Sequence, residues 1–139
     1  MDFLEYKARL WNTDIRNEKG QIMHFDKGSF LALIDSDKEL FQSLLELYSK
    51  DWPQVIQNIK QGIQSKDFRA IEYNGHRIKG NLRNFYATEL SELAYKVEEA
   101  GRNENINHLR ETVVILEEGL KKLEVELQEF YKELSLCNQ

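Results

Sequence analysis

The sequence predicts an all-α protein, an antiparallel four-helix bundle with short additional helices at its N-terminus. Three observations indicate this fold. The chain of 139 residues contains one proline and seven glycines among many good helix formers. Apolar residues recur at steps of three and four, whereas the alternation typical of strands is nearly absent. The predicted long helices are joined by short turns, which favours antiparallel packing within one domain.

The N-terminal 25 residues form the least regular part of the chain. Their apolar residues have the spacing of a short amphipathic helix: Phe3, Leu4, Leu10 and Trp11. Asp26 is then expected to cap a short helix that ends near Ile34. We therefore divide the chain into an N-terminal extension packed on the bundle (1–25), the bundle itself (26–135) and a C-terminal tail (136–139).

The first long helix is expected to begin at the capping box formed by Ser36 and Glu39. Its apolar stripe comprises Leu40, Phe41, Leu44, Leu45, Tyr48, Trp52, Ile56, Ile59 and Ile63. Pro53 either kinks one helix or begins a new one. The stripe keeps its phase across this proline, which favours a kink. Residues 62–65 are expected to end the helix.

The next two helices have predicted boundaries as well. Ser65 is expected to cap the second long helix, which carries His76. Residues 84–88 form a tight connection, and Thr88 is expected to cap the third helix. Gly101 lies where a C-terminal glycine would end that helix.

The last helix has the most regular pattern in the chain. Its apolar residues form a seam with alternating steps of three and four: Ile106, Leu109, Val113, Leu116, Leu120, Leu123, Leu127, Phe130 and Leu134. A seam of about 29 residues is about 43 Å long, more than its predicted neighbours. Its far end therefore needs another partner. We favour the segment with Phe3, Leu10 and Trp11, and so expect a monomer; a second copy of the chain is the alternative.

Composition excludes several classes of function. The net charge of −5 argues against nucleic acid as the main partner. Cys137, the one cysteine, cannot form an internal disulfide, and no stretch resembles a signal or membrane segment, so we expect a stand-alone cytoplasmic protein that begins at Met1. His24 and His108 have no partners at metal-ligand spacing and are expected to be structural, so no metal or cofactor is expected. No catalytic dyad or nucleotide-binding motif is visible, which excludes a kinase activity of its own.

His76 is the main candidate for chemistry. On a helical wheel it lies about 130° from the centre of the apolar stripe and should face water. Lys79 and Gly80 follow it on the same face, one turn later. A helical glycine costs about 1 kcal/mol relative to alanine, so Gly80 requires a reason. Bare backbone would let another protein approach closely, and the lysine would hold a phosphoryl group on the ring.

A basic region surrounds this histidine. Between Lys66 and Arg83 the net charge is +3, which leaves −8 for the rest of the chain. This region would suit an anionic target, although such a patch is often only a solvated helix face. Glu72, one turn before His76, either accepts a hydrogen bond from its ring or is an ordinary surface glutamate.

The run His76-Arg77-Ile78-Lys79-Gly80 resembles the His-x-x-Lys-Gly motif of histidine phosphotransfer (HPt) domains of multistep two-component phosphorelays. The resemblance extends roughly over residues 26–134 and includes Ala87-Thr88-Glu89-Leu90 at the start of the following helix. It implies relay of a phosphoryl group between receiver-domain aspartates through phosphohistidine at His76. The implied partners are response-regulator receiver domains, which supply Mg²⁺, and a hybrid sensor histidine kinase. Arg77 and Arg83 would then support docking.

The sequence departs from the family pattern after Gly80. It has Asn81, Leu82 and Arg83, and Tyr86 replaces a glycine whose use there is a left-handed backbone conformation. We expect Asn84 to take over that turn and Tyr86 to pack across the hairpin. Two alternatives remain open: a non-phosphorylated adaptor that binds a receiver or another signalling partner, and a structural dimer through the last helix.

Overall fold

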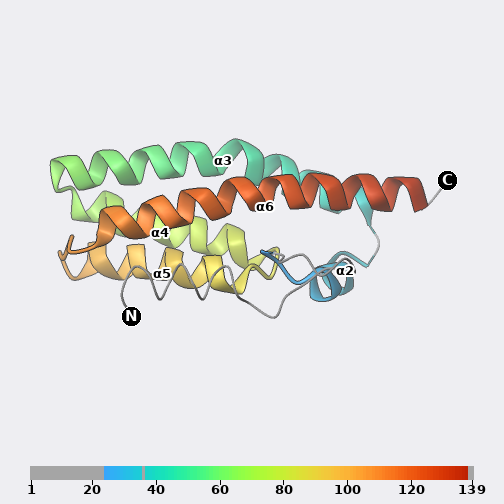
Figure 1. The fold of residues 1–139 in the computed structure, drawn as a ribbon, viewed down its shortest axis with the longest axis horizontal. Helices are drawn as coiled ribbons and strands as arrows, with labels where there is room; N and C mark the ends of the chain where they lie inside the picture. Colours follow the sequence, from blue (N-terminus) through green and yellow to red (C-terminus); the bar gives the residue numbers. More distant parts are fainter. Residues whose placement is uncertain (1–23, 36, 138–139) are drawn as a thin grey trace.

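The structure, a computed structural model, describes residues 24–35 and 37–137 (Figure 1). It contains α2 (Lys27–Ile34), α3 (Lys38–Ser65), α4 (Phe68–Arg83), α5 (Thr88–Arg102) and α6 (Leu109–Cys137). The last four form a bundle, and α2 lies beneath the end of α6 that extends past α4 and α5. The described residues contain no strand. The predicted all-α bundle is confirmed.

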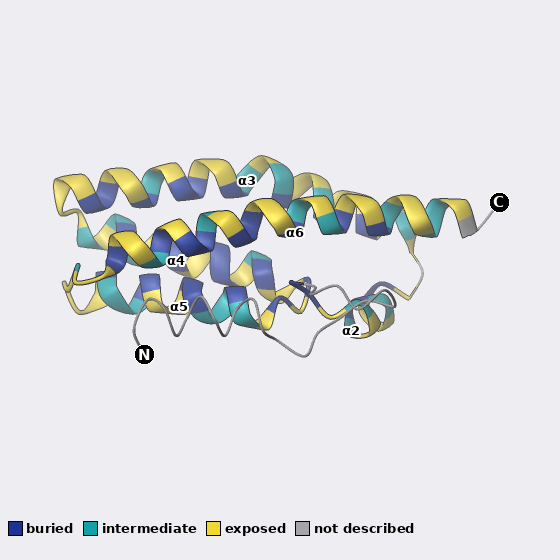
Figure 2. Cartoon of the chain, viewed as in Figure 1, coloured by how far each residue is buried: buried dark blue, intermediate teal, exposed yellow. Residues whose placement is uncertain are grey.

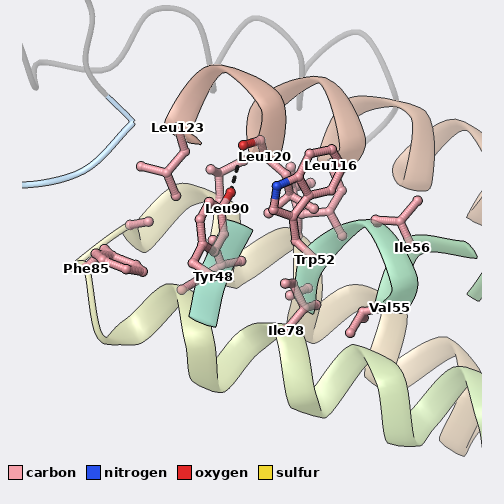
Figure 3. Packing of buried hydrophobic residues seen from close by; sticks show 14 of the residues in the cluster. Tyr48, Trp52, Val55, Ile56, Ile78, Phe85, Leu90, Leu116, Leu120 and Leu123 are labelled. Atoms are coloured by element: carbon pink, nitrogen blue, oxygen red, sulfur yellow. Dashed lines mark hydrogen bonds between the residues drawn. The ribbon is translucent and has the colours of Figure 1, made fainter. Parts of the chain in front are cut away.

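The bundle is arranged so that α3 and α5 each contact both of the other two helices, which places α4 and α6 on a diagonal. The buried residues form one core along the whole bundle (Figure 2). Tyr48 and Trp52 of α3 enter this core between α4, α5 and α6 (Figure 3). The Tyr48 hydroxyl donates to the Leu120 carbonyl at 2.7 Å, so its polar atom is satisfied despite burial.

Aspartates cap three of the helices. The carboxylates of Asp26, Asp37 and Asp67 each accept the backbone N–H three residues later. The prediction for Asp26 is confirmed. The cap of α3 is Asp37 rather than the predicted Ser36, and the cap predictions for Ser65 and Thr88 are also wrong. Ser65 is the last residue of α3, and the chain turns at Lys66 (φ 57°), which brings Asp67 to the cap position of α4.

Two other predicted boundaries change. Thr88 is the first residue of α5, where Ala87 occupies the cap position without a side-chain hydrogen bond. Gly101 lies inside α5 and is buried, so it does not end the helix. Pro53 lies within α3, which is one helix from Lys38 to Ser65 rather than two.

The described residues that precede α3, 24–34, cover the far end of α6. Phe25 packs on Phe130 at 5.7 Å between ring centroids, and Phe30 packs on Phe41 at 4.8 Å. The backbone N–H of His24, itself buried, donates to Glu126 of α6 at 2.6 Å, in keeping with its predicted structural role. Phe3, Leu10 and Trp11, which were predicted to cover this end, lie outside the described residues.

Within the described part of the chain, no helix combines the length and the apolar character needed to span a membrane.

Candidate phosphotransfer site

His76 stands on the outer face of α4. Its side chain is 72% exposed, as the helical wheel predicts. The opposite face of α4 packs against the core through Ile71, Ile78 and Leu82, which are buried. This packing fixes the rotation of α4 about its axis. The imidazole is therefore presented to solvent by the packing of its own helix.

A buried carboxylate of the neighbouring helix contacts the ring. Glu98 of α5 is 4% exposed, and its Oε1 lies 3.1 Å from Nδ1 of His76. The same oxygen lies 2.7 Å from Nζ of Lys79, and Oε2 accepts from Arg102 at 2.7 Å. One carboxylate thus joins the histidine to two cations.

These contacts determine the charge of Glu98. Burial alone would raise its pKa, but the hydrogen bonds from Lys79, His76 and Arg102 hold the pKa of Glu98 below its ordinary value. The carboxylate is ionised at neutral pH and can only accept hydrogen bonds. In the neutral imidazole, the proton must then lie on Nδ1 and the lone pair on Nε2, which has no hydrogen bond to any described residue.

Two glycines allow α4 and α5 to approach this closely. A Cβ on Gly75 would lie 2.6 Å from the backbone nitrogen of Glu98, and one on Gly101 would lie 2.4 Å from that of Glu72. Any side chain at these positions would push the helices apart. Gly101 is therefore needed for the close packing of α4 against α5. This close packing brings Glu98 within reach of His76.

Comparison with known proteins agrees with this geometry. The family model of the Hpt domain matches residues 43–134. The chain belongs to the Hpt domain family. This Hpt protein is also similar in structure to histidine-containing phosphotransfer protein B (HptB) from Pseudomonas aeruginosa PAO1, with a TM-score of 0.73 and 17% sequence identity. The similarity covers 79% of this chain and 96% of HptB and concerns the fold. No curated protein matches the sequence.

Family membership supports a role in histidine phosphotransfer within phosphorelays. The family match begins inside α3, so α2 and the segment before it lie outside the matched region. In the described residues, no group of three or more histidine, cysteine, aspartate or glutamate side chains is placed to hold a metal ion.

Lys79 and Gly80 differ from each other in surroundings. Lys79 of this Hpt protein is 8% exposed, because its ammonium group binds Glu98 and lies 5.1 Å from the centre of the Tyr95 ring. Lys79, which was predicted to share the exposed face of His76, is therefore buried against α5. Gly80 is exposed, and a Cβ there would meet nothing within 4 Å, so packing inside the protein does not require this glycine.

Glu72 is not hydrogen-bonded to the histidine ring. Glu72 accepts a hydrogen bond from Nε of Arg102 at 2.9 Å. The hydrogen bond with the His76 ring, which the sequence suggested for Glu72, is made by Glu98. Sequence reasoning missed Glu98 because the contact joins two helices, 22 residues apart. One signal was present: Glu98 follows Val97 and precedes Gly101 on the apolar side of α5, where an unpaired charge would be costly.

The two arginines also have different surroundings. Arg77 donates to Asp51 of α3 at 3.0 and 2.5 Å, and Asn81 donates to the same carboxylate at 2.9 Å. Arg77 therefore ties α4 to α3. Arg83 is exposed and has no ion pair with any described residue, and it borders a surface groove together with Tyr86.

Tyr86 itself adopts the left-handed conformation, with φ of 55°, and its side chain is 39% exposed. The prediction that Asn84 would take this role is wrong, since its φ is −60°. The backbone N–H of Tyr86 donates to the Arg83 carbonyl, and that of Ala87 donates to the Leu82 carbonyl, both at 3.1 Å. This pair of bonds is a Schellman motif, which requires the left-handed residue at position 86.

Proposed function

We propose that this Hpt protein accepts a phosphoryl group on Nε2 of His76 and passes it between the aspartates of two receiver domains. The observation that carries the proposal is the contact between the exposed imidazole and the buried, ionised Glu98. A solvated surface histidine would not need a buried carboxylate from another helix. The contact orients the ring and selects the tautomer with a nucleophilic nitrogen facing outward.

The transfer step follows from this arrangement. The lone pair of Nε2 forms the new P–N bond while the P–O bond to the receiver aspartate breaks, and that aspartate leaves as a carboxylate. Positive charge develops on the ring, whose proton stays on Nδ1. Glu98 stabilises this charge at 3.1 Å, and the reverse transfer uses the same contact.

The surroundings of His76 support docking of a receiver domain. Gly80 leaves open backbone one turn beyond the histidine, so a partner surface can approach the ring closely. Arg83 adds an exposed positive charge on the same helix, which would pair with acidic groups of a receiver and raise the association rate. We expect the receiver to supply Mg²⁺ and a hybrid sensor kinase to be the first phosphoryl donor.

Transfer of labelled phosphate from phosphorylated receiver domains of the same organism tests this function. Label should appear on the wild-type protein, be lost in mild acid, and be absent from His76→Gln. His108→Gln is the matched control, because His108 is also exposed but lies before α6, and it should keep the label. Acid-stable label, or label that persists in His76→Gln, would contradict the proposal. Receiver binding without any transfer would favour the adaptor.

Variants of the two motif residues test the docking geometry. Gly80→Gln should block transfer while the bundle stays folded, because the new side chain points into solvent where the receiver must approach. Lys79→Ala should slow transfer, because it removes the cation that binds the same oxygen of Glu98 as His76 does. Normal transfer rates in both variants would show that receivers do not use this surface.

A further inference from the structure

Helix α6 has a second regular face, on the side turned away from the core. Its residues, which we call the outer stripe, are Val114, Glu118, Lys121, Val125, Glu129, Lys132 and Leu136. All seven are exposed, and the three apolar ones are 57%, 52% and 70% exposed. Exposed residues follow α6 along its whole length in Figure 2. Single exposed apolar residues are common, but three on one line of a helix form a regular surface.

The outer stripe is symmetric about Val125. Its steps are four, three, four, four, three and four residues, the same from either end. Glu118 lies seven residues before Val125, and Lys132 lies seven after it. Lys121 and Glu129 lie four residues to either side. Each acidic residue on one side of Val125 thus matches a basic residue on the other.

We propose that the outer stripe joins two copies of this chain into an antiparallel dimer centred on Val125. A two-fold axis at Val125 places every glutamate of the stripe opposite a lysine of the other copy. It also places Val114 opposite Leu136, since each lies eleven residues from the axis. Parallel pairing would instead place each charged residue opposite the identical residue of the other chain, and the two like charges would repel each other.

The geometry of α6 permits this pairing. Steps that repeat every eleven residues keep a stripe nearly parallel to the helix axis, so two helices can lie side by side over about 33 Å. The four charged side chains of the stripe have no ion pair with any described residue of their own chain, so they are available to a second copy. Three apolar side chains per copy make a small interface, so we expect a dissociation constant in the micromolar range.

The dimer leaves the phosphotransfer site open. Helix α6 lies diagonally across the bundle from α4, so its outer face is turned away from His76. The sequence-based expectation of a monomer concerned the apolar seam of α6, whose far end the described segment with Phe25 and Phe30 covers. The outer stripe is a different face of the same helix. A dimer formed through it would offer two His76 sites to receiver domains at once.

Sedimentation equilibrium of the full-length protein tests the proposal, at concentrations from about 10 to about 500 µM. The average mass should rise from the 16.5 kDa of one chain toward twice that value. Val125→Asp, which places two carboxylates at the axis, should keep the protein monomeric throughout. Leu47→Asp, an equally exposed position on α3, should not change the association. A monomer at the highest concentration, or a dimer that Val125→Asp does not weaken, would overturn the proposal.

Charge reversal tests the antiparallel register. Lys132→Glu alone faces Glu118 of the other copy at both ends of the interface and should weaken the dimer about tenfold. Adding Glu118→Lys restores opposite charges at both ends, so the double variant should associate as the wild type does. Circular dichroism of each variant confirms that the bundle is folded. A double variant that stays as weak as Lys132→Glu would contradict the antiparallel register.

Discussion

At the scale of the residue, the site depends on one carboxylate. Glu98 is the group through which His76, Lys79 and Arg102 are connected, although it lies on a different helix from the histidine. An ionised Glu98 keeps the proton of the neutral imidazole on Nδ1 and leaves the lone pair on Nε2, the atom that we propose as the nucleophile. In the proposed transfer, this buried neighbour thus sets which nitrogen of the exposed histidine reacts.

The lowered pKa of Glu98 predicts a dependence of stability on pH. Because its folded-state pKa lies below the unfolded value of about 4.3, the unfolded state binds more protons in acid. The stabilisation is present above about pH 4.3 and is lost as pH falls through the folded-state pKa. Urea denaturation should therefore show wild type more stable than Glu98→Gln at pH 7, with the difference shrinking toward pH 3. Glu111→Gln, on the exposed side of α6, should show no such convergence; a constant difference for Glu98→Gln would contradict the prediction.

Tyr86 predicts a second effect at this scale. The left-handed conformation of Tyr86 costs about 1–2 kcal/mol of folding free energy. A glycine avoids this strain but loses more backbone entropy on folding, so only part of the cost is recovered. Tyr86→Gly should therefore raise the free energy of unfolding by up to about 1 kcal/mol, measured by urea denaturation. Tyr86→Ala retains the backbone strain and should give no gain. A gain in the alanine variant, or a loss in the glycine variant, would show that side-chain contacts rather than backbone conformation decide stability here.

At the scale of the element, the α4–α5 pair brings His76 and Glu98 together. Its helices meet at glycines, and the two glycines nearest to His76 have opposite surroundings. Gly75 faces the backbone of Glu98, while Gly80 faces open space. The first is a packing residue and the second is available to a partner.

Alanine substitutions should separate these two roles. Gly75→Ala should lower the free energy of unfolding by about 2 kcal/mol or more, because its Cβ overlaps the backbone of α5. Gly80→Ala should raise it by about 0.5–1 kcal/mol, because alanine favours the helix and meets nothing. Chemical denaturation of both variants at neutral pH measures the two effects. Equal effects of the two substitutions would contradict the assigned packing.

Prediction from sequence succeeded for the repeating apolar pattern and failed for contacts between distant elements and for the exact ends of helices. The repeating apolar steps identified the long helices and placed His76 on an exposed face. Glu98 was missed because the approach of α4 to α5 depends on where Gly75 and Gly101 meet the other helix. Tyr86 was misjudged because the Schellman bonds, rather than the intrinsic preference of Asn84, decide which residue is left-handed.

At the scale of the whole molecule, the bundle is longer than the part that carries the site. Helix α6 extends past α4 and α5 (Figure 1). Phe25, which packs on Phe130, and the rest of 24–34 cover its far end. The backbone N–H of Asp26 also donates to the Tyr86 carbonyl at 3.3 Å, which connects this cover to the turn after α4. Residues 24–34 are therefore part of the folded core.

Removal of an aromatic side chain from residues 24–34 should destabilise the entire bundle. Phe30 is fully buried between Phe25, Phe41 and Phe85, so Phe30→Ala should lower the free energy of unfolding by about 3–5 kcal/mol. Leu33→Ala, at a half-exposed position of the same helix, should cost much less. Thermal and urea denaturation measure both variants. A loss for Phe30→Ala as small as that for Leu33→Ala would show that the cover is not part of the cooperative core.

The site of phosphorylation within the histidine ring tests the central claim most directly. Long-range ¹H–¹⁵N correlation spectra of His76, recorded before and after phosphorylation by a receiver domain, distinguish the two ring nitrogens. Our account predicts a proton on Nδ1 before transfer and the phosphoryl group on Nε2 after it, with Nδ1 still facing Glu98. A phosphoryl group on Nδ1, or an unchanged His76 spectrum in a protein that carries phosphate, would contradict it.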